Sequence, residues 1–125
     1  MVKVSVEIPD QMIADVVITA FYGGETNWVS EIGVAKAEVA RNYGIGEPSE
    51  GLRKALVDGS VLTFYCTDPD TWKNFTRRAT FRKVAEALVK RSAVTGASLF
   101  DSGEWDATES DVVLQIAALG EITYG

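Results

Sequence analysis

Residues 61–79, VLTFYCTDPDTWKNFTRRA, decide the fold class. The first six, VLTFYC, are β-branched, aromatic or otherwise apolar, which is typical of a buried strand. Asp68-Pro69-Asp70 has the chemistry of a turn, and residues 73–79 can return as the second strand. We therefore expect an antiparallel hairpin at the centre of the domain.

Helices are predicted on both sides of this hairpin in the sequence. Residues 10–22 carry apolar side chains at helical spacing, with Asp10 as the expected cap and Gly23–Gly24 as a left-handed end. Thr80 is expected to cap the helix that follows the hairpin, because Phe81, Val84, Ala85 and Leu88 share one side.

The last helix is expected to open at Thr108 and to end at Gly120. Asp111 would then occupy its third position, where a carboxylate interacts favourably with the helix dipole. Val112, Val113, Ile116 and Leu119 would supply its apolar face.

The other segments give weaker signals. Residues 2–8 alternate apolar and polar side chains, which predicts a strand. A further strand is expected to start near Trp28, before a loop through Gly44, Gly46 and Pro48, although the Ala-rich VAKAEVARNYG can also extend as a helix. Ser49 can cap a short helix that reaches Val57. Together the elements predict a single α+β domain over residues 1–125, an antiparallel sheet with a central hairpin packed against about three helices.

Composition excludes several classes of protein. The chain has 125 residues, of which 46% are apolar and 24% charged, an ordinary balance for one globular domain. No apolar run approaches the roughly 18–20 residues of a membrane span. The first ten residues also lack the apolar core of a signal peptide, and one cysteine allows no intrachain disulfide. We therefore expect a cytoplasmic protein with no membrane partner.

The sequence contains few residues suited to catalysis. The sequence contains no histidine, which excludes histidine-based triads and nearly every zinc site. Cys66 lies in an apolar strand and is expected to be a plain buried thiol. The acids Asp68 and Asp70, and the group Asp101, Glu104 and Asp106, fit solvated loops better than acid–base catalysis or a calcium loop. We expect no enzyme, no cofactor and no metal.

Charge is distributed unevenly along the chain. Residues 72–91 hold seven bases and one acid, a formal charge of +6, whereas the rest holds five bases and seventeen acids, a charge of −12. We call residues 72–91 the basic segment. It can dock a compact anion such as a nucleotide, while the acidic remainder would repel a long nucleic acid. The alternative is that its bases are an ordinary solvated helix face.

The basic segment supplies the candidate binding residues. Arg78, with Arg82 and Lys83 from the next helix turn, is expected to meet the anion, because guanidinium groups bind phosphate in a bidentate way. Trp72 or Tyr65 would stack on a base. Strand alternation places Arg77 on the opposite side from Arg78, toward solvent or a subunit boundary.

Both ends of the chain resemble a known group. ITAFYGGETNW contains Gly23, Gly24, Asn27 and Trp28, and ESDVVLQIAALGEITYG contains Asp111, Gln115, Gly120, Glu121, Tyr124 and Gly125. These segments resemble uncharacterised small proteins encoded by bacteriophages and prophages of actinobacteria, although residues 35–55 depart from that pattern. The resemblance implies a viral origin and no particular activity.

Four residues of these two segments are further candidates. Trp28 and Tyr124 are large aromatics beside glycines, and either fill the core or line a cleft. Gln115 follows Asp111 by one helical turn and needs a partner if buried, so the pair can contact a ligand or anchor a strand edge.

Three functions remain open. The first is a non-enzymatic phage protein that sequesters an anionic nucleotide signal of host immunity, which the basic segment with its aromatics and the absence of catalytic residues support. The second is an inhibitor or adaptor that binds a host protein through an acidic surface. A hydrolase ranks last. Twelve large aromatics in so small a chain also predict a homo-oligomer.

Overall fold

The hairpin expected over residues 61–79 forms as β3 (Val61–Thr67) and β4 (Asn74–Thr80). It belongs to a four-stranded antiparallel sheet in the order β2-β1-β3-β4, with β1 at Val29–Lys36 and β2 at Val39–Gly44. We describe it in a computed structural model that covers Val2, residues 5–24 and residues 26–124.

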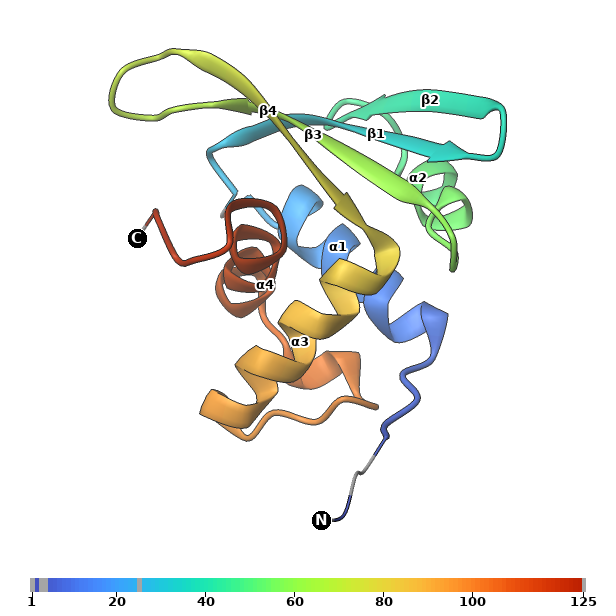
Figure 1. Ribbon diagram of the computed structural model, residues 1–125. Helices are drawn as coiled ribbons and strands as arrows, with labels where there is room; N and C mark the ends of the chain where they lie inside the picture. The colour runs from blue at the N-terminus through green and yellow to red at the C-terminus, as the bar shows by residue number, and fades with distance from the viewer. Residues whose placement is uncertain (1, 3–4, 25, 125) are drawn as a thin grey trace.

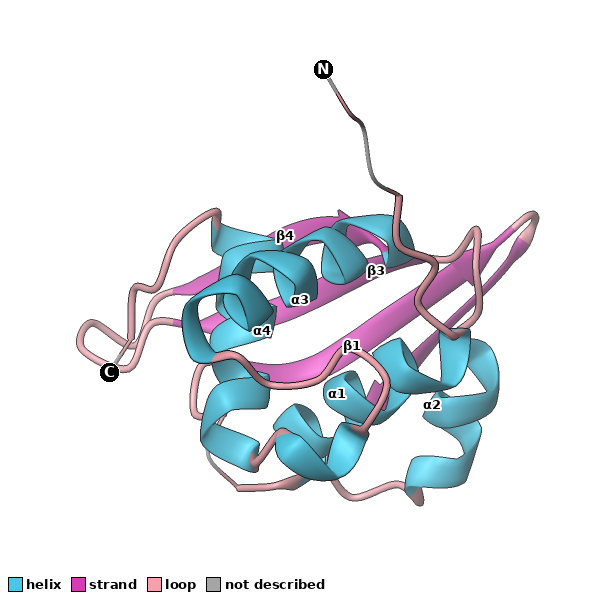
Figure 2. Ribbon diagram, turned by 90° about the horizontal axis from the view of Figure 1, so that it is seen from below, coloured by secondary structure: helices cyan, strands magenta, loops and turns pink. Residues whose placement is uncertain are grey.

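The helices lie together on one side of this sheet, and the other side is uncovered (Figures 1 and 2). They are α1 (Asp10–Tyr22), α2 (Ser49–Ala55), α3 (Phe81–Thr95) and α4 (Ala107–Leu119), with a short 3₁₀ helix at Ser102–Glu104. The α+β class and the antiparallel sheet with a helical layer are confirmed, and α2 is the short helix expected after Ser49.

The period of two along β3 explains the two layers. Leu62, Phe64 and Cys66 are buried and face the helices, whereas Val61 and Tyr65 alternate with them on the uncovered face. Phe64 packs near Trp28, with the ring centroids 6.3 Å apart. The core therefore lies between the sheet and the helical layer.

The strand predicted over residues 2–8 is wrong for the part that the structure describes. Val2 and residues 5–8 have no strand pairing, and Lys3 and Val4 lie outside the described residues. Alternation produces a strand only where a neighbouring strand supplies hydrogen bonds, and the four paired strands all come from residues 29–80. Ile8 instead packs against the core from a loop.

The β1–β2 hairpin shows where the sequence was ambiguous. A strand near Trp28 was expected and forms as β1, but β2 was not predicted. Its residues VARNYG are mostly exposed because β2 is an edge strand, with only Tyr43 buried. Ala37, at φ 54°, makes the tight turn between the two strands.

Two of the expected helix starts are shifted, that of α1 by one residue and that of α4 by two. Asp10 is the first residue of α1 rather than its cap, and its carboxylate accepts a hydrogen bond from the Asp58 amide at 3.2 Å. Helix α4 begins at Ala107 and is capped by the Asp106 carboxylate, which accepts from Glu109 N at 2.8 Å. Asp111 is therefore its fifth residue and not its third.

The remaining helix boundaries lie closer to those predicted from the sequence. Thr80 caps α3 by accepting from Lys83 N at 3.0 Å, and Gly120 ends α4 in the left-handed conformation. At the end of α1 the left-handed residue is Gly24, with φ 83°, whereas Gly23 keeps a right-handed φ of −79°. Helix α2 stops at Ala55, two residues before the expected end. Across the described residues, no helix is long and apolar enough to cross a membrane.

Candidate functional site

The bases of the basic segment are spread over several surfaces. Arg78 projects from β4 onto the uncovered face of the sheet, opposite Thr63. Arg82 lies on the outer side of α3, 3.7 Å from Glu86, and lines a cavity to which Arg78 and Lys83 do not contribute. The structure therefore does not gather Arg78, Arg82 and Lys83 in one pocket.

Arg91 of the basic segment forms an ion pair with an acidic residue of α4. Its Nε donates to Glu109 Oε2 at 2.6 Å and its Nη2 donates to Glu109 Oε1 at 2.9 Å, which joins α3 to α4. These hydrogen bonds raise the pKa of the Arg91 guanidinium above its usual value. Arg91 thus has a structural partner, whereas Lys83 and Lys90 are exposed on α3.

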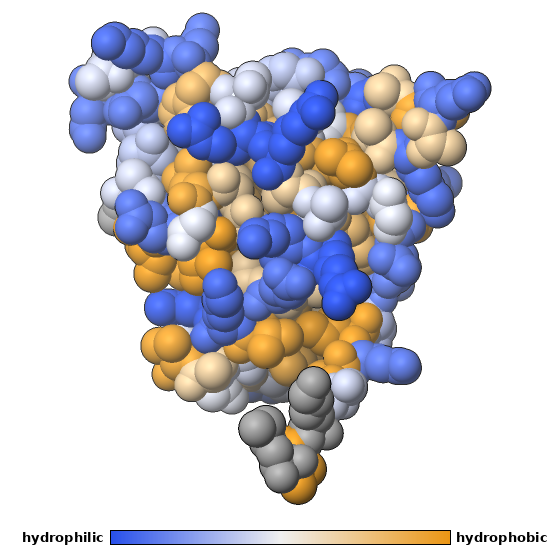
Figure 3. Space-filling view, viewed as in Figure 1, coloured by the Kyte–Doolittle hydropathy of each residue, from blue (hydrophilic) through white to orange (hydrophobic). Residues whose placement is uncertain are grey.

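Figure 3 views the molecule from the side of α3. Hydrophilic residues, in blue, cross the middle of this face over the helix, and hydrophobic residues, in orange, lie below them toward the N-terminal segment. This face is therefore a mixture of hydrophilic and hydrophobic residues.

Tyr65 and Arg78 are neighbours on the uncovered sheet face. The register pairs Thr63 with Arg78 and Tyr65 with Thr76, so Tyr65 and Arg78 stand on adjacent strands, one rung apart. Tyr65 also lines a shallow hollow of about 360 Å³ together with Asn74 and Thr76. An aromatic ring, a guanidinium group and polar side chains therefore share one open surface.

Arg77 points to the helix-facing side of β4, as alternation predicts. Its guanidinium lies over the Phe75 ring at 4.9 Å from the centroid and donates to the Thr76 carbonyl at 2.9 Å. It also lines a hollow with Asp68, Glu121 and other residues at the C-terminal end of α4. Acids therefore surround Arg77, which makes it a poor anion site.

Trp28, Asp111, Gln115 and Tyr124 converge in one buried polar network. Asp111 Oδ1 accepts from Trp28 Nε1 at 2.8 Å, and its Oδ2 accepts from Gln115 Nε2 at 2.8 Å. The Gln115 side chain then holds the C-terminal segment, accepting from Tyr124 N at 2.8 Å and donating to Tyr124 O at 3.0 Å. Gly125, the last residue of that motif, lies outside the described residues.

This network occupies the polar atoms of its members. Trp28 and Gln115 are fully buried and Asp111 is 9% exposed, so none presents a free surface. The Trp28 and Tyr124 rings lie 6.0 Å apart, and burial, followed by the charges of Asp68 and Asp70, raises the pKa of the Tyr124 hydroxyl. The geometry is that of an anchor that ties α4, the residues before β1 and the C-terminal segment together.

Cys66 is buried on the helix-facing side of β3. Its Sγ lies 3.2 Å from the Phe64 carbonyl, and burial raises the pKa of the thiol from 9.0 to about 11. A thiol with so high a pKa is protonated at neutral pH and is a weak nucleophile.

Trp72 lies at the tip of the β3–β4 hairpin. The turn is built around Asp68, whose N–H donates to Lys73 O at 2.9 Å and whose O accepts from Trp72 N at 2.8 Å. The Asp68 carboxylate accepts from Asp70 N at 2.8 Å, which fixes the first half of the turn. These bonds leave Trp72 in the left-handed region, at φ 61°.

The conformation and the exposure of Trp72 are both unusual. A left-handed conformation costs an L-residue about 1–2 kcal/mol, and turns of this kind normally use glycine or asparagine there. The side chain is 80% exposed, so the indole ring makes little packing contact in return. Trp72 therefore contributes nothing to the fold that a glycine would not.

The sequence did not indicate the cavity that Arg82 lines, between α1 and α3. Its residues come from the N-terminal segment, α1, the loop before β3 and α3, so no local motif marks it. The spacing of Arg82, Glu86 and Val89 along one side of α3 was the available signal.

The described residues contain no cluster of three or more acid or thiol side chains placed to hold a metal ion. Comparison with known proteins found no family model, no curated protein and no solved structure that matches this chain.

Proposed function

We propose that this is a non-enzymatic binding protein, of the bacteriophage type suggested by its end motifs, that docks onto a host protein through the tip of the β3–β4 hairpin. One observation carries the proposal, the 80% exposed Trp72 held at φ 61°. Tryptophan is enriched at the hot spots of protein interfaces, and strained backbone is concentrated at functional sites.

The surroundings of Trp72 favour a basic partner. Asp68 and Asp70 outnumber Lys73 in the same turn, and Glu121 lines the neighbouring hollow together with Asp68 and Arg77. The tip therefore suits an apolar pocket ringed by lysine or arginine.

Two variants separate the role of the Trp72 ring in binding from the cost of its backbone conformation. Trp72→Gly removes the ring and relieves the backbone, so we expect the free energy of unfolding to stay the same or rise by up to about 1 kcal/mol. Trp72→Ala removes the ring and keeps the backbone cost. Both should weaken binding to the host protein by about 30-fold or more, as loss of an interface anchor does.

The host protein is found by placing a photo-crosslinking amino acid at position 71, beside the intact Trp72, in cells, with position 100 as the matched control because Phe100 is 66% exposed. The host protein identified in the adduct that forms only from position 71 is then purified on its own and titrated with the wild-type chain and the variants by calorimetry. Equal binding by wild type and Trp72→Ala would exclude the hairpin tip as the anchor.

A second candidate function is sequestration of an anionic nucleotide on the uncovered sheet face. The placement of Tyr65 one rung from Arg78 favours it, because a base can stack on the ring while the guanidinium group holds a phosphate. Calorimetry with a panel of nucleoside mono- and diphosphates tests it, with Arg78→Ala expected to reduce affinity about ten- to hundredfold.

Arg41→Ala is the matched control for that experiment. Arg41 is already paired with Glu47 at 3.0 Å and lies over the Tyr43 ring, on the helix-facing side of β2. Its removal should leave nucleotide affinity unchanged. Equal losses from both substitutions would mean that Arg78 is a solvated surface charge.

A further inference from the structure

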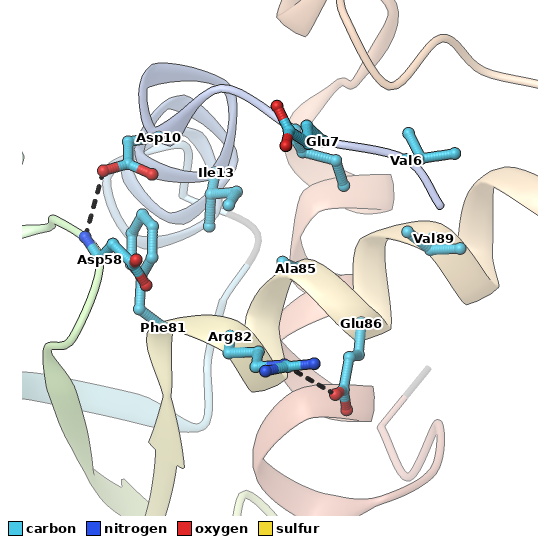
Figure 4. Close-up of a pocket in the computed structure, with 11 residues that line it drawn as sticks. Val6, Glu7, Asp10, Ile13, Asp58, Phe81, Arg82, Ala85, Glu86 and Val89 are labelled. Atoms are coloured by element: carbon cyan, nitrogen blue, oxygen red, sulfur yellow. Dashed lines mark hydrogen bonds and ion pairs between the residues drawn. The ribbon is translucent and has the colours of Figure 1, made fainter. Parts of the chain in front are cut away.

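A cavity of about 790 Å³ opens between the N-terminal segment, the first turn of α1 and the outer side of α3 (Figure 4). It shares no lining residue with the hairpin tip or with the hollow beside Tyr65. Its volume lies within the range of roughly 300–1,000 Å³ that is usual for small-molecule sites.

The inner surface of the cavity is apolar. Ile13 and Phe81 are buried at its base, where Ala85 of α3 also contributes. At the end nearer the N-terminus, Val6 is 51% and Val89 41% exposed. Apolar groups that line a concave surface and remain exposed gain free energy when a ligand covers them.

The rim of the cavity is acidic. Among the lining residues that the structure describes, the acids are Glu7, Asp10, Asp58 and Glu86 and the one base is Arg82, so these residues have a formal charge of −3. The Asp10 carboxylate accepts from the Asp58 amide, and Arg82 lies 3.7 Å from Glu86 in an exposed pair that leaves both groups hydrated. Surface pairs of this kind are weak, so a ligand can compete for Glu86.

We propose that this cavity binds a small organic cation, an aromatic or aliphatic body that carries an ammonium or guanidinium group. The apolar body lies against Ile13, Phe81 and Ala85, and the positive group lies among the rim carboxylates. The net charge of −6 on the whole chain also attracts cationic ligands to the site and disfavours anions there.

Three related compounds separate charge from shape. Tryptamine is a cation, tryptophol is its neutral alcohol and indole-3-propionate is an anion, and all three carry the same indole ring on a short chain. Each is titrated into the isotopically labelled full chain and followed by NMR chemical shifts. We expect tryptamine to shift Ile13, Ala85 and Val89, with affinity about tenfold or more above indole-3-propionate.

Single substitutions on the rim change the affinity in opposite directions. Glu86→Gln should weaken tryptamine binding about two- to fivefold, and Arg82→Ala should strengthen it by a similar factor. Both side chains are largely exposed, so neither change threatens the fold. Glu38→Gln removes an exposed acid from the β1–β2 turn, away from the cavity, and should have no effect.

Ala85→Phe fills the base of the cavity and should abolish binding of all three compounds, whatever their charge. Four results would overturn the proposal. These are shifts that map elsewhere, equal affinities for tryptamine and indole-3-propionate, unchanged tryptamine binding after the two rim substitutions, and the absence of any shift with tryptamine. The rim variants decide the question even if Ala85→Phe does not fold.

Discussion

Asp111 is a carboxylate whose two oxygens face only donors. Trp28 Nε1 and Gln115 Nε2 each donate to it at 2.8 Å, and the Thr26 hydroxyl lies 2.7 Å from Oδ1 and 2.8 Å from the Ala20 carbonyl. The single hydroxyl hydrogen of Thr26 can serve one of these acceptors at a time. Asp111 therefore holds together parts of the chain that are far apart in sequence.

Asp111→Asn turns one acceptor into a donor and brings two donors face to face. We expect the free energy of unfolding to fall by about 1–3 kcal/mol, since a buried donor is left without a partner. Urea denaturation measures the loss. Asp70→Asn, a change of the same kind on the exposed turn, is the control and should cost little.

Cys66 gives the stability a dependence on alkaline pH. Its pKa is 9.0 in the unfolded chain and about 11 in the folded one, so the folded state holds the proton more tightly. The resulting stability is fully present below pH 9.0 and is lost as the pH rises to about 11, by an amount on the order of 2 kcal/mol.

Denaturation at a series of pH values across this window measures the effect. Cys66→Ala should lower stability at every pH, because it removes a buried side chain, but should reduce the slope in the window. An unchanged slope in the variant would assign the alkaline loss to other groups, of which Tyr22 and Tyr124 also have raised pKa values.

At the scale of elements, the end of α1 meets the start of α4 at Gly23. A Cβ at this position would lie 2.6 Å from the Ala107 Cβ and would also collide with the Thr19 carbonyl. Gly23 is therefore required by close packing, and Gly24 next to it by its φ of 83°.

Gly23→Ala is expected to push the helices apart and cost about 1–3 kcal/mol. Adding Ala107→Gly should restore part of this loss, because it removes the atom that the new methyl meets. Gly24→Ala has open space around it and should cost only about 1–2 kcal/mol of backbone strain. Thermal melts of the three variants decide whether the loss at Gly23 is due to packing.

The elements also differ in how far the sequence could predict them. β3 and β4 were predicted because apolar density and the Asp68-Pro69-Asp70 turn are both local signals. β2 could not be, because an edge strand needs few apolar residues, and residues 2–8 show that alternation without a partner strand is not enough.

The same distinction holds for the candidate site. Strand alternation correctly separates Arg77 from Arg78, because that period is local. The separation of Arg78 from Arg82 depends on where α3 begins and on the direction in which its side chains project. The cavity beside α3 also needs residues from the N-terminal segment, α1 and the loop before β3. The relative positions of side chains from different elements depend on tertiary packing, which no single stretch of sequence predicts.

At the scale of the whole molecule, the sheet edges carry positive charge at their centres. Arg41 lies in the middle of β2, and Arg77 and Arg78 in the middle of β4. Two copies that paired edge to edge about a two-fold axis would bring like charges together. Self-association through the edges is therefore disfavoured.

The homo-oligomer expected from the aromatic content stays a prediction, and the uncovered sheet face is the surface we expect it to use. Its central row contains Asn42, Gly33, Thr63 and Arg78. Light scattering at micromolar concentration should show a dimer or larger species, which Thr63→Arg dissociates. A monomer would rule this out.

The contact between α1 and α4 has a consequence for biosynthesis. α1 leaves the ribosome before α4, yet Asp111 of α4 holds Trp28, and Ala107 packs on Gly23. The β-hairpins need only their own neighbours and can form on the nascent chain, whereas the helical layer cannot close before α4 has emerged. Until then, α1 exposes apolar side chains that are buried in the folded domain.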